Sequence, residues 1–205
     1  MREQFISNLR TVFSEHNFTE TTLANNLVFV YETAGLDLAG LYRIFTVISN
    51  IEPAIKNFEI INTIAENEIT HICIDGDFIT YGQAKYDVNS LKYSDGRPDF
   101  IAFDDNTFLF VELKLNQEDA TFSKENTKWS KFSEGANQIL DFVNFLRKRG
   151  FEIKSYYSII YGVVAMRFEP DFSIKTRGNS ARNNEIFKIS QKLGFKIIAQ
   201  NHFEF

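Results

Sequence analysis

Gly96-Arg97-Pro98-Asp99-Phe100-Ile101-Ala102-Phe103 continues, through the polar tetrapeptide Asp104-Asp105-Asn106-Thr107, into Phe108-Leu109-Phe110-Val111-Glu112-Leu113-Lys114-Leu115. Two apolar runs on either side of turn-forming Asp and Asn residues are the pattern of a β-hairpin. Three charged residues, Asp99, Glu112 and Lys114, interrupt runs that otherwise have the composition of buried strands. The hairpin therefore combines a buried strand pair with a candidate site for chemistry.

Strand alternation sorts the side chains of the second run onto two faces. Glu112 and Lys114 share one face with Phe108 and Phe110, whereas the other face is apolar and has the composition of core: Leu109, Val111, Leu113 and Leu115. A hairpin that folds about Asp105 places Asp99 across from Val111 or Glu112, so the Asp99 carboxylate is expected to approach that of Glu112. Two carboxylates and one ammonium then converge.

These charges have two explanations, because a buried charge is costly unless it is paired or bound to a metal. The first is an internal salt bridge of Lys114 with Asp99 or Glu112. The second is a Mg²⁺ site, since this cation takes oxygen ligands from one or two carboxylates together with water and phosphate. In the second case Lys114 is expected to orient or deprotonate the attacking water, or to stabilise charge that develops on a phosphorane.

The order of these residues resembles the PD-(D/E)xK nuclease motif. Pro98-Asp99 opens one apolar run, Glu112-Leu113-Lys114 closes the next, and a predicted helix that contains Gln138 follows. The resemblance covers residues 96–146 and leaves the first part of the chain aside. It extends to restriction endonucleases, Holliday-junction resolvases and nucleases of defence or repair.

The resemblance implies a fold, a cofactor and residue roles. The implied fold is a restriction-endonuclease-like α/β sandwich with a mixed central sheet, and the implied cofactor is Mg²⁺ or Mn²⁺. The implied roles are metal binding by Asp99 and Glu112, assistance to the attacking water by Lys114, and a place near the metal for Gln138. Many members of the family carry a further glutamate on an earlier helix, and Glu66 and Glu68 are the nearest candidates upstream.

Length and composition favour one compact domain of 205 residues, with a helical portion at 1–68 and the nuclease-like core at 69–205. Hydrophobic residues make up 44% of the chain, including 22 phenylalanines, which is enough for an aromatic-rich core. The single cysteine, Cys73, excludes an internal disulfide framework and a cysteine-based zinc site. The start of the chain lacks the apolar run of a signal peptide, so a cytoplasmic protein without membrane contact is expected.

Apolar residues at helical spacing predict four helices before the core. They are a helix at 3–16 with Phe5, Leu9 and Val12, a second with Leu23, Leu27, Val30 and Tyr31, a third from Asp37 through Ile48, and a fourth from Pro53 through Ile64. The glutamates of this half are expected to be solvated. Strands are predicted at 69–75 and 78–81, followed by a polar loop at 82–95 that leads to the hairpin.

The part after the hairpin alternates between loops, helices and strands, as in an α/β sandwich. Residues 116–129 are predicted to be a polar loop over the site, with a helix from Ser133 to Gly150, a central strand at 156–166, a loop at 167–182, a helix at 183–193 and a last strand at 195–199. The candidate nucleic-acid-binding residues are Lys124, Lys128, Lys131 and Arg177. Each is equally consistent with an ordinary solvated position.

Two functions follow from these observations. The first is a Mg²⁺-dependent endonuclease or exonuclease that hydrolyses phosphodiester bonds in DNA, with RNA as a weaker alternative. The second is a catalytically silent binding protein with the nuclease fold, such as an immunity or antitoxin-like partner of another protein. A net charge of −5 counts against a broad nucleic-acid surface, although a local basic patch and a metal can hold a phosphate backbone.

Overall fold

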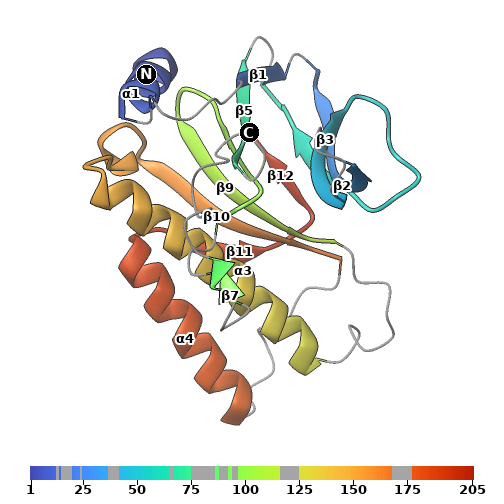
Figure 1. Ribbon diagram of the computed structural model, residues 1–205, viewed down its shortest axis with the longest axis vertical. Helices are drawn as coiled ribbons and strands as arrows, with labels where there is room; N and C mark the ends of the chain where they lie inside the picture. Colours follow the sequence, from blue (N-terminus) through green and yellow to red (C-terminus); the bar gives the residue numbers. More distant parts are fainter. Residues whose placement is uncertain are drawn as a thin grey trace.

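In the computed structural model the described residues form a six-stranded sheet, a four-stranded sheet, a two-stranded pair and a layer of helices (Figure 1). The structure describes residues 1–12, 14, 20–23, 25–36, 42–64, 67–74, 86–87, 92–93, 97–115, 125–167 and 177–205. Within these ranges the side chains at 34–36, 42–45, 86–87, 92–93, 125–126, 177–180 and 182 are left aside. The predicted α/β class with a mixed sheet is confirmed.

The larger sheet has six strands in the order β1-β5-β8-β9-β10-β11. β1, β5, β8 and β9 pair antiparallel, whereas β9, β10 and β11 run parallel to one another. The strands span Glu20–Leu23 (β1), Ile69–Cys73 (β5), Phe100–Phe103 (β8), Thr107–Lys114 (β9), Ile159–Met166 (β10) and Lys196–Ala199 (β11). The predicted hairpin is β8–β9, and the predicted central strand is β10.

The register of the hairpin decides between the two predicted alignments. Phe100 pairs with Val111, so the next position outward sets Asp99 opposite Glu112 rather than Val111. The opposite end of the hairpin closes at Asp104, whose carboxylate Oδ1 accepts hydrogen bonds from the backbone N–H groups of Asn106 (2.7 Å) and Thr107 (2.6 Å). The two carboxylates therefore lie at the open end of the hairpin.

The predicted N-terminal helical portion is wrong beyond its first helix. Helix α1 (Arg2–Val12) forms as expected and buries Phe5 and Leu9. The next segments form strands β2 (Leu27–Leu36), β3 (Tyr42–Ser49) and β4 (Phe58–Ile61), which build a second sheet in the order β12-β4-β2-β3. Strand β12 (His202–Glu204) was not predicted at all.

The physical reason lies in the composition of these segments. Residues 27–33 and 44–48 consist largely of β-branched and aromatic residues, which favour a pleated surface over a helix. Leu27, Val30 and Tyr31 satisfy helical spacing, but Val28, Phe29 and Val30 are all buried in a row. A helix that presents one face to a core does not bury three consecutive residues, whereas a strand covered on both faces does.

Helices α3 (Glu125–Lys148) and α4 (Arg177–Leu193) pack on one face of the larger sheet (Figure 1). Both begin earlier than predicted, so Lys128 and Arg177 are helical rather than in loops. The earlier start of α3 follows from Trp129 and Phe132, which are buried and continue the apolar stripe of the helix toward its N-terminus. Gly150 and Gly194 follow the two helices with positive φ angles of 75° and 79°, as their predicted stop role requires.

Two apolar layers lie on either side of the larger sheet. The layer beneath the helices is aromatic, and Phe5 of α1 packs against the rings of Phe103 (4.9 Å between centroids) and Phe108 (5.3 Å). The layer between the two sheets includes Val28, Phe58, Leu109 and Val111, among others. The face of β9 that carries Leu109 and Val111 is therefore core, as predicted. The face that carries Phe108 and Phe110 is core as well, as far as Phe110.

Strands of the first 68 residues are hydrogen-bonded to later strands in both sheets. β1 pairs with β5 in the larger sheet, and β4 pairs in parallel with β12 in the smaller one. The segment at 82–95, predicted as a loop, contains a two-residue pair, β6 (Tyr86–Asp87) with β7 (Lys92–Tyr93).

Among the helices that the structure describes, none combines the length and the apolar character that crossing a membrane would require.

Candidate functional site

The open end of the β8–β9 hairpin fixes the Asp99 side chain by its backbone contacts. The Asp99 carboxylate Oδ2 accepts a hydrogen bond from the backbone N–H of Leu113 at 2.5 Å. The Asp99 carbonyl accepts a second one from the N–H of Ile74 at 2.8 Å. Asp99 is thus held between β5 and β9, directly beside the end of β9 that carries Glu112.

Lys114 is the centre of a polar cluster on the helix-facing side of β9. Its ammonium Nζ lies 2.6 Å from Glu112 Oε1, 3.2 Å from Glu134 Oε1 and 2.9 Å from the amide oxygen Oε1 of Gln138. Glu112 and Lys114 come from the strand, whereas Glu134 and Gln138 come from successive turns of α3. The predicted pairing of Lys114 with Glu112 is therefore present, and the predicted neighbour Gln138 contacts the same ammonium.

Electrostatics keep Lys114 and Glu134 charged. Burial of the Lys114 ammonium lowers its pKa, but the attraction and hydrogen bonds of Glu112 and Glu134 outweigh burial, so the pKa is raised above its ordinary value. Burial also acts on Glu134 by raising its pKa, and the neighbouring Lys131 and Lys114 outweigh it, so the pKa is lowered. Lys114 is consequently an ammonium near neutral pH, a hydrogen-bond donor and not a base.

Gly135 allows α3 to approach the site closely. A Cβ atom at this position would lie 2.8 Å from Cγ1 of Val164 on β10 and 3.1 Å from Cγ of Glu112. Both distances are shorter than ordinary van der Waals contact, so a larger residue would push against the Glu112 side chain. The absence of a side chain at 135 therefore sets how near Glu134 and Gln138 come to β9.

Gln138 also contacts the segment just before β8 that carries Asp99. Its amide nitrogen Nε2 donates to the backbone carbonyl of Arg97 at 3.4 Å, while its Oε1 accepts from Lys114. One side chain of α3 therefore bridges the start of β8 and the end of β9. Gln138 therefore lies beside Lys114, which also pairs with Glu112, and a place for Gln138 near a metal stays a prediction.

The predicted nucleic-acid-binding residues are only partly described. Lys128 and Lys131 lie in the first turns of α3, and Lys131 Nζ pairs with Glu134 Oε2 at 2.8 Å. Lys124 lies outside the described residues, as does the side chain of Arg177. Lys131 is thus linked through Glu134 to Lys114.

Glu66 and Glu68 are the two candidates for the further glutamate that the resemblance implies. Glu68 pairs with Arg2, and its carbonyl accepts from Arg2 Nη1 at 2.9 Å. It immediately precedes β5, whose second residue Thr70 pairs with Phe103 beside the hairpin turn. Glu68 therefore lies at the other end of the hairpin from Asp99. Glu66 lies outside the described residues.

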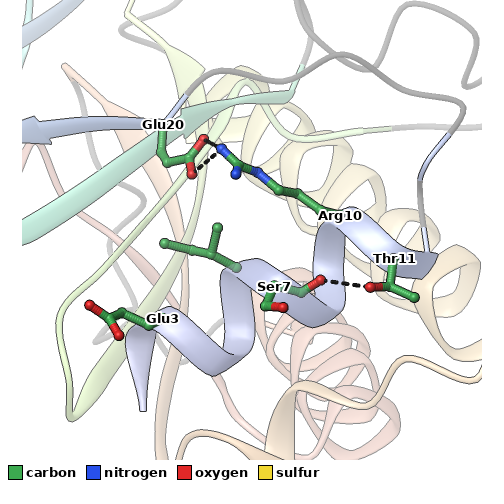
Figure 2. A pocket seen from close by; sticks show the side chains of 6 residues that line it. Glu3, Ser7, Arg10, Thr11 and Glu20 are labelled. Carbon is green, nitrogen blue, oxygen red and sulfur yellow. Dashed lines mark hydrogen bonds and ion pairs between the residues drawn. The ribbon is translucent and has the colours of Figure 1, made fainter.

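A shallow depression of about 460 Å³ lies against α1, away from the polar cluster (Figure 2). Its guanidinium, from Arg10, contacts both carboxylate oxygens of Glu20 on β1 at 2.5 and 2.7 Å, and Thr11 donates to the Ser7 carbonyl at 2.9 Å. The first residues of α1 bind Asp105 in the hairpin turn, which is the closed end. The depression thus marks the docking of α1 rather than the candidate site.

The donor set at the open end suits a hard divalent cation. Two carboxylates from adjacent antiparallel strands match the one or two carboxylates with which proteins hold Mg²⁺, while water and substrate phosphate complete the shell. In the part of the chain that the structure describes, no group of three or more His, Cys, Asp or Glu side chains is arranged to hold a metal by itself. Asp99 and Glu112 would supply two of the oxygen ligands that such an ion takes.

Glu134 is a member of the cluster that the sequence did not predict. Its position one helical turn before Gln138 was the available signal, because residues four apart share a helix face. No family model, curated protein or solved structure matches this chain. The geometry around Lys114 is accordingly the main evidence on function.

Proposed function

We propose that this protein is a divalent-metal-dependent nuclease that hydrolyses phosphodiester bonds in DNA. The observation that carries the proposal is the register that sets Asp99 opposite Glu112 at the open end of one hairpin, where Glu112 is only 3% exposed and its Oε1 lies 2.6 Å from Lys114 Nζ. A buried carboxylate beside a second carboxylate is costly unless something positively charged binds it. Lys114 supplies one positive charge, and a dication suits the remaining donors.

The fold supports a restriction-endonuclease-like assignment within this proposal. An antiparallel hairpin is followed by a long helix and then by a strand parallel to its second arm, which is the order β8, β9, α3 and β10. The polar cluster lies where β9 ends and α3 passes over it. This is the place where the resembled motif would put its chemistry.

The chain's own residues have distinct tasks in the proposed reaction. Asp99 and Glu112 would hold Mg²⁺ or Mn²⁺, which supplies Lewis acidity toward the phosphate and its leaving oxygen. Lys114, an ammonium, donates hydrogen bonds to the attacking water or to a phosphate oxygen as negative charge develops there. Gln138 holds the Lys114 ammonium from the side of α3.

DNA is the proposed partner, bound at the N-terminal turns of α3. Lys128 and Lys131 lie there on the same helix as Gln138, and further contacts from Lys124 and Arg177 remain predictions. Phosphate contacts by lysine are sequence-independent and fall with salt. RNA uses the same phosphate chemistry and is the alternative substrate within this proposal, and a cytoplasmic location is a prediction.

The test is cleavage of supercoiled plasmid, single-stranded DNA and RNA with Mg²⁺ or Mn²⁺, and with a chelator as the blank. We expect metal-dependent cleavage of DNA by the wild type and a loss of at least about 100-fold in Asp99→Asn, Glu112→Gln and Lys114→Met. His202→Gln, at an exposed position of β12, should cleave normally. Cleavage at the wild-type rate by all three site variants would exclude the assignment.

A second function is favoured because the charged and polar side chains of the cluster pair with one another. Glu112, Lys114, Glu134 and Gln138 bind one another within the chain, as in a structural salt-bridge network. A catalytically silent protein with this fold would bind another protein instead. Failure to cleave any of the substrates, together with stoichiometric binding of one protein and no heat of Mn²⁺ binding, would favour that function.

A further inference from the structure

The Lys114 ammonium has two carboxylate partners that differ in surroundings. Glu112 Oε1 lies at 2.6 Å and belongs to a side chain that is 4% exposed. Glu134 Oε1 lies at 3.2 Å, on a side chain that is 48% exposed, and its other oxygen Oε2 binds Lys131 at 2.8 Å. Three charges, from Lys131 through Glu134 to Lys114, thus lead from the helix surface to the buried Glu112.

A divalent ion at Asp99 and Glu112 would change the balance of forces on Lys114. The charge of Glu112 would be shared with the dication, and the dication itself would repel the ammonium. The strength of both interactions depends on how far water screens the charges, and it is greatest where water is excluded. A second negative charge in contact with the ammonium offsets that repulsion, and Glu134 supplies one, with its Oε1 3.2 Å from Lys114 Nζ.

We propose that Glu134 is a positioning residue, which holds the Lys114 ammonium beside the metal-binding carboxylates when Glu112 is committed to a divalent ion. The inference rests on the proposed nuclease function. Gln138 orients the same ammonium but carries no charge, so it does not offset the repulsion. Gly135 is part of the arrangement, because its missing side chain allows the adjacent Glu134 to come within reach of the strand.

A double-mutant cycle on metal affinity tests the inference without any turnover. Mg²⁺ and Mn²⁺ are titrated calorimetrically into the wild type, Glu134→Gln, Lys114→Met and the double variant. We expect Glu134→Gln to weaken metal binding, because Lys114 then competes more strongly for Glu112. In the Lys114→Met background, the fold-change in metal Kd caused by Glu134→Gln should be at least about twofold smaller than in the wild type. Only the through-space loss of a negative charge remains there.

Steady-state cleavage of DNA gives an independent readout. Loss of a positioning contact should lower kcat of Glu134→Gln by about 10- to 100-fold, with KM unchanged or lower. A merely electrostatic surface carboxylate predicts the opposite, since its removal should ease the approach of DNA phosphates and speed cleavage at low substrate. Glu134→Asp should recover part of kcat, because it restores the charge at a slightly greater distance.

Glu152→Gln is the matched control. Glu152 pairs with Arg147 at 3.1 Å and is 44% exposed, so the two substitutions each remove one half-exposed paired carboxylate from the same molecule. This control should leave both kcat and metal affinity unchanged.

The outcomes separate this inference from the function on which it rests. Normal wild-type cleavage with normal kcat in Glu134→Gln would overturn the role of Glu134 and leave the nuclease proposal standing. Additive effects on metal affinity in the cycle would overturn it in the same way. A wild type that neither binds the metals nor cleaves DNA would overturn both, and a melting temperature of Glu134→Gln close to that of the wild type secures the comparison.

Discussion

Glu112 and Lys114 show what single residues contribute to this site. Glu112 is buried, so removal of Lys114 would take away a positive charge that compensates this carboxylate, which costs more than the pair contributes. Their alternation with Phe108 and Phe110 on one strand face puts a charged pair at the end of an aromatic layer. The apolar layer excludes water on one side, so the interactions of the pair are strengthened.

Gly135→Ala is expected to destabilise the protein although alanine favours helices. The added Cβ would meet Val164 at 2.8 Å and Glu112 at 3.1 Å. Overpacking of this kind costs about 1 to 3 kcal/mol, against a helix-propensity gain of about 1 kcal/mol. Urea denaturation measures the change, and Asn144→Ala, at an exposed position of α3, should be neutral or slightly stabilising. Equal stability gains in both variants would contradict the close approach.

His71 makes folding stability depend on pH. The side chain is buried in β5 against Phe100, and burial lowers its pKa from 6.5 to about 3. The unfolded chain therefore binds a proton that the folded chain rejects, so stability should fall as the pH drops from 6.5 toward 3, by up to about 1.4 kcal/mol per pH unit.

Thermal or urea unfolding of the wild type and His71→Leu across this pH range checks the prediction. The wild type should lose more stability on acidification than the variant does, because carboxylate protonation is common to both. His202→Gln, which changes an exposed histidine, should follow the wild type. Parallel curves for the wild type and His71→Leu would show that His71 does not contribute.

At the scale of the element, the β8–β9 hairpin separates a structural from a chemical role of Asp99. Its Oδ2 accepts from the Leu113 N–H at 2.5 Å. Asp99→Ala leaves that backbone donor unsatisfied and should destabilise the fold by about 1 to 3 kcal/mol. Asp99→Asn keeps an accepting oxygen and should fold almost normally, yet lose Mn²⁺ binding. Denaturation and calorimetry on both variants measure the two effects, and retained Mn²⁺ binding in Asp99→Asn would remove Asp99 from the metal site.

The hairpin could be predicted from sequence because its signals are local. A strand period of two, a polar turn and charges at fixed spacing define both the register and the faces. The helix prediction was wrong at residues 27–36 because Leu27, Val30 and Tyr31 satisfy helical spacing as well as a strand pattern. The β-branched content of this segment was the deciding signal. The pairing of β4 with β12 joins segments far apart in sequence, and no local pattern predicts such a contact.

The candidate site divides in the same way. Asp99, Glu112 and Lys114 lie on neighbouring strands, so alternation and hairpin geometry were sufficient to bring them together. The position of Gln138 could be predicted from the face of the helix on which it lies. To predict that Glu134 contacts Lys114, one has to know the distance between α3 and β9. That distance depends on the packing of Gly135 against Val164, which is a property of the folded molecule.

At the scale of the whole molecule, residues 202–205 hold one edge of the smaller sheet, where β12 pairs with β4. The ring of Phe205 is 7% exposed in the layer between the sheets, and its N–H donates to the Ile61 carbonyl at 2.9 Å. Phe205→Ala should lower the free energy of unfolding by about 3 kcal/mol or more. His202→Ala, an exposed change in β12, is the control for denaturant unfolding. A loss of less than about 1 kcal/mol in Phe205→Ala would show that the end of the chain does not stabilise the fold.

The central claim is that Asp99 and Glu112 together hold a divalent ion. The measurement that tests it most directly is anomalous diffraction from crystals of the wild type soaked in Mn²⁺, with Glu112→Gln crystals soaked in parallel. We expect a Mn²⁺ peak between the Asp99 and Glu112 carboxylates of the wild type, and its loss in the variant. Crystals saturated with Mn²⁺ that show no peak between these carboxylates, or the same peak in Glu112→Gln, would contradict it.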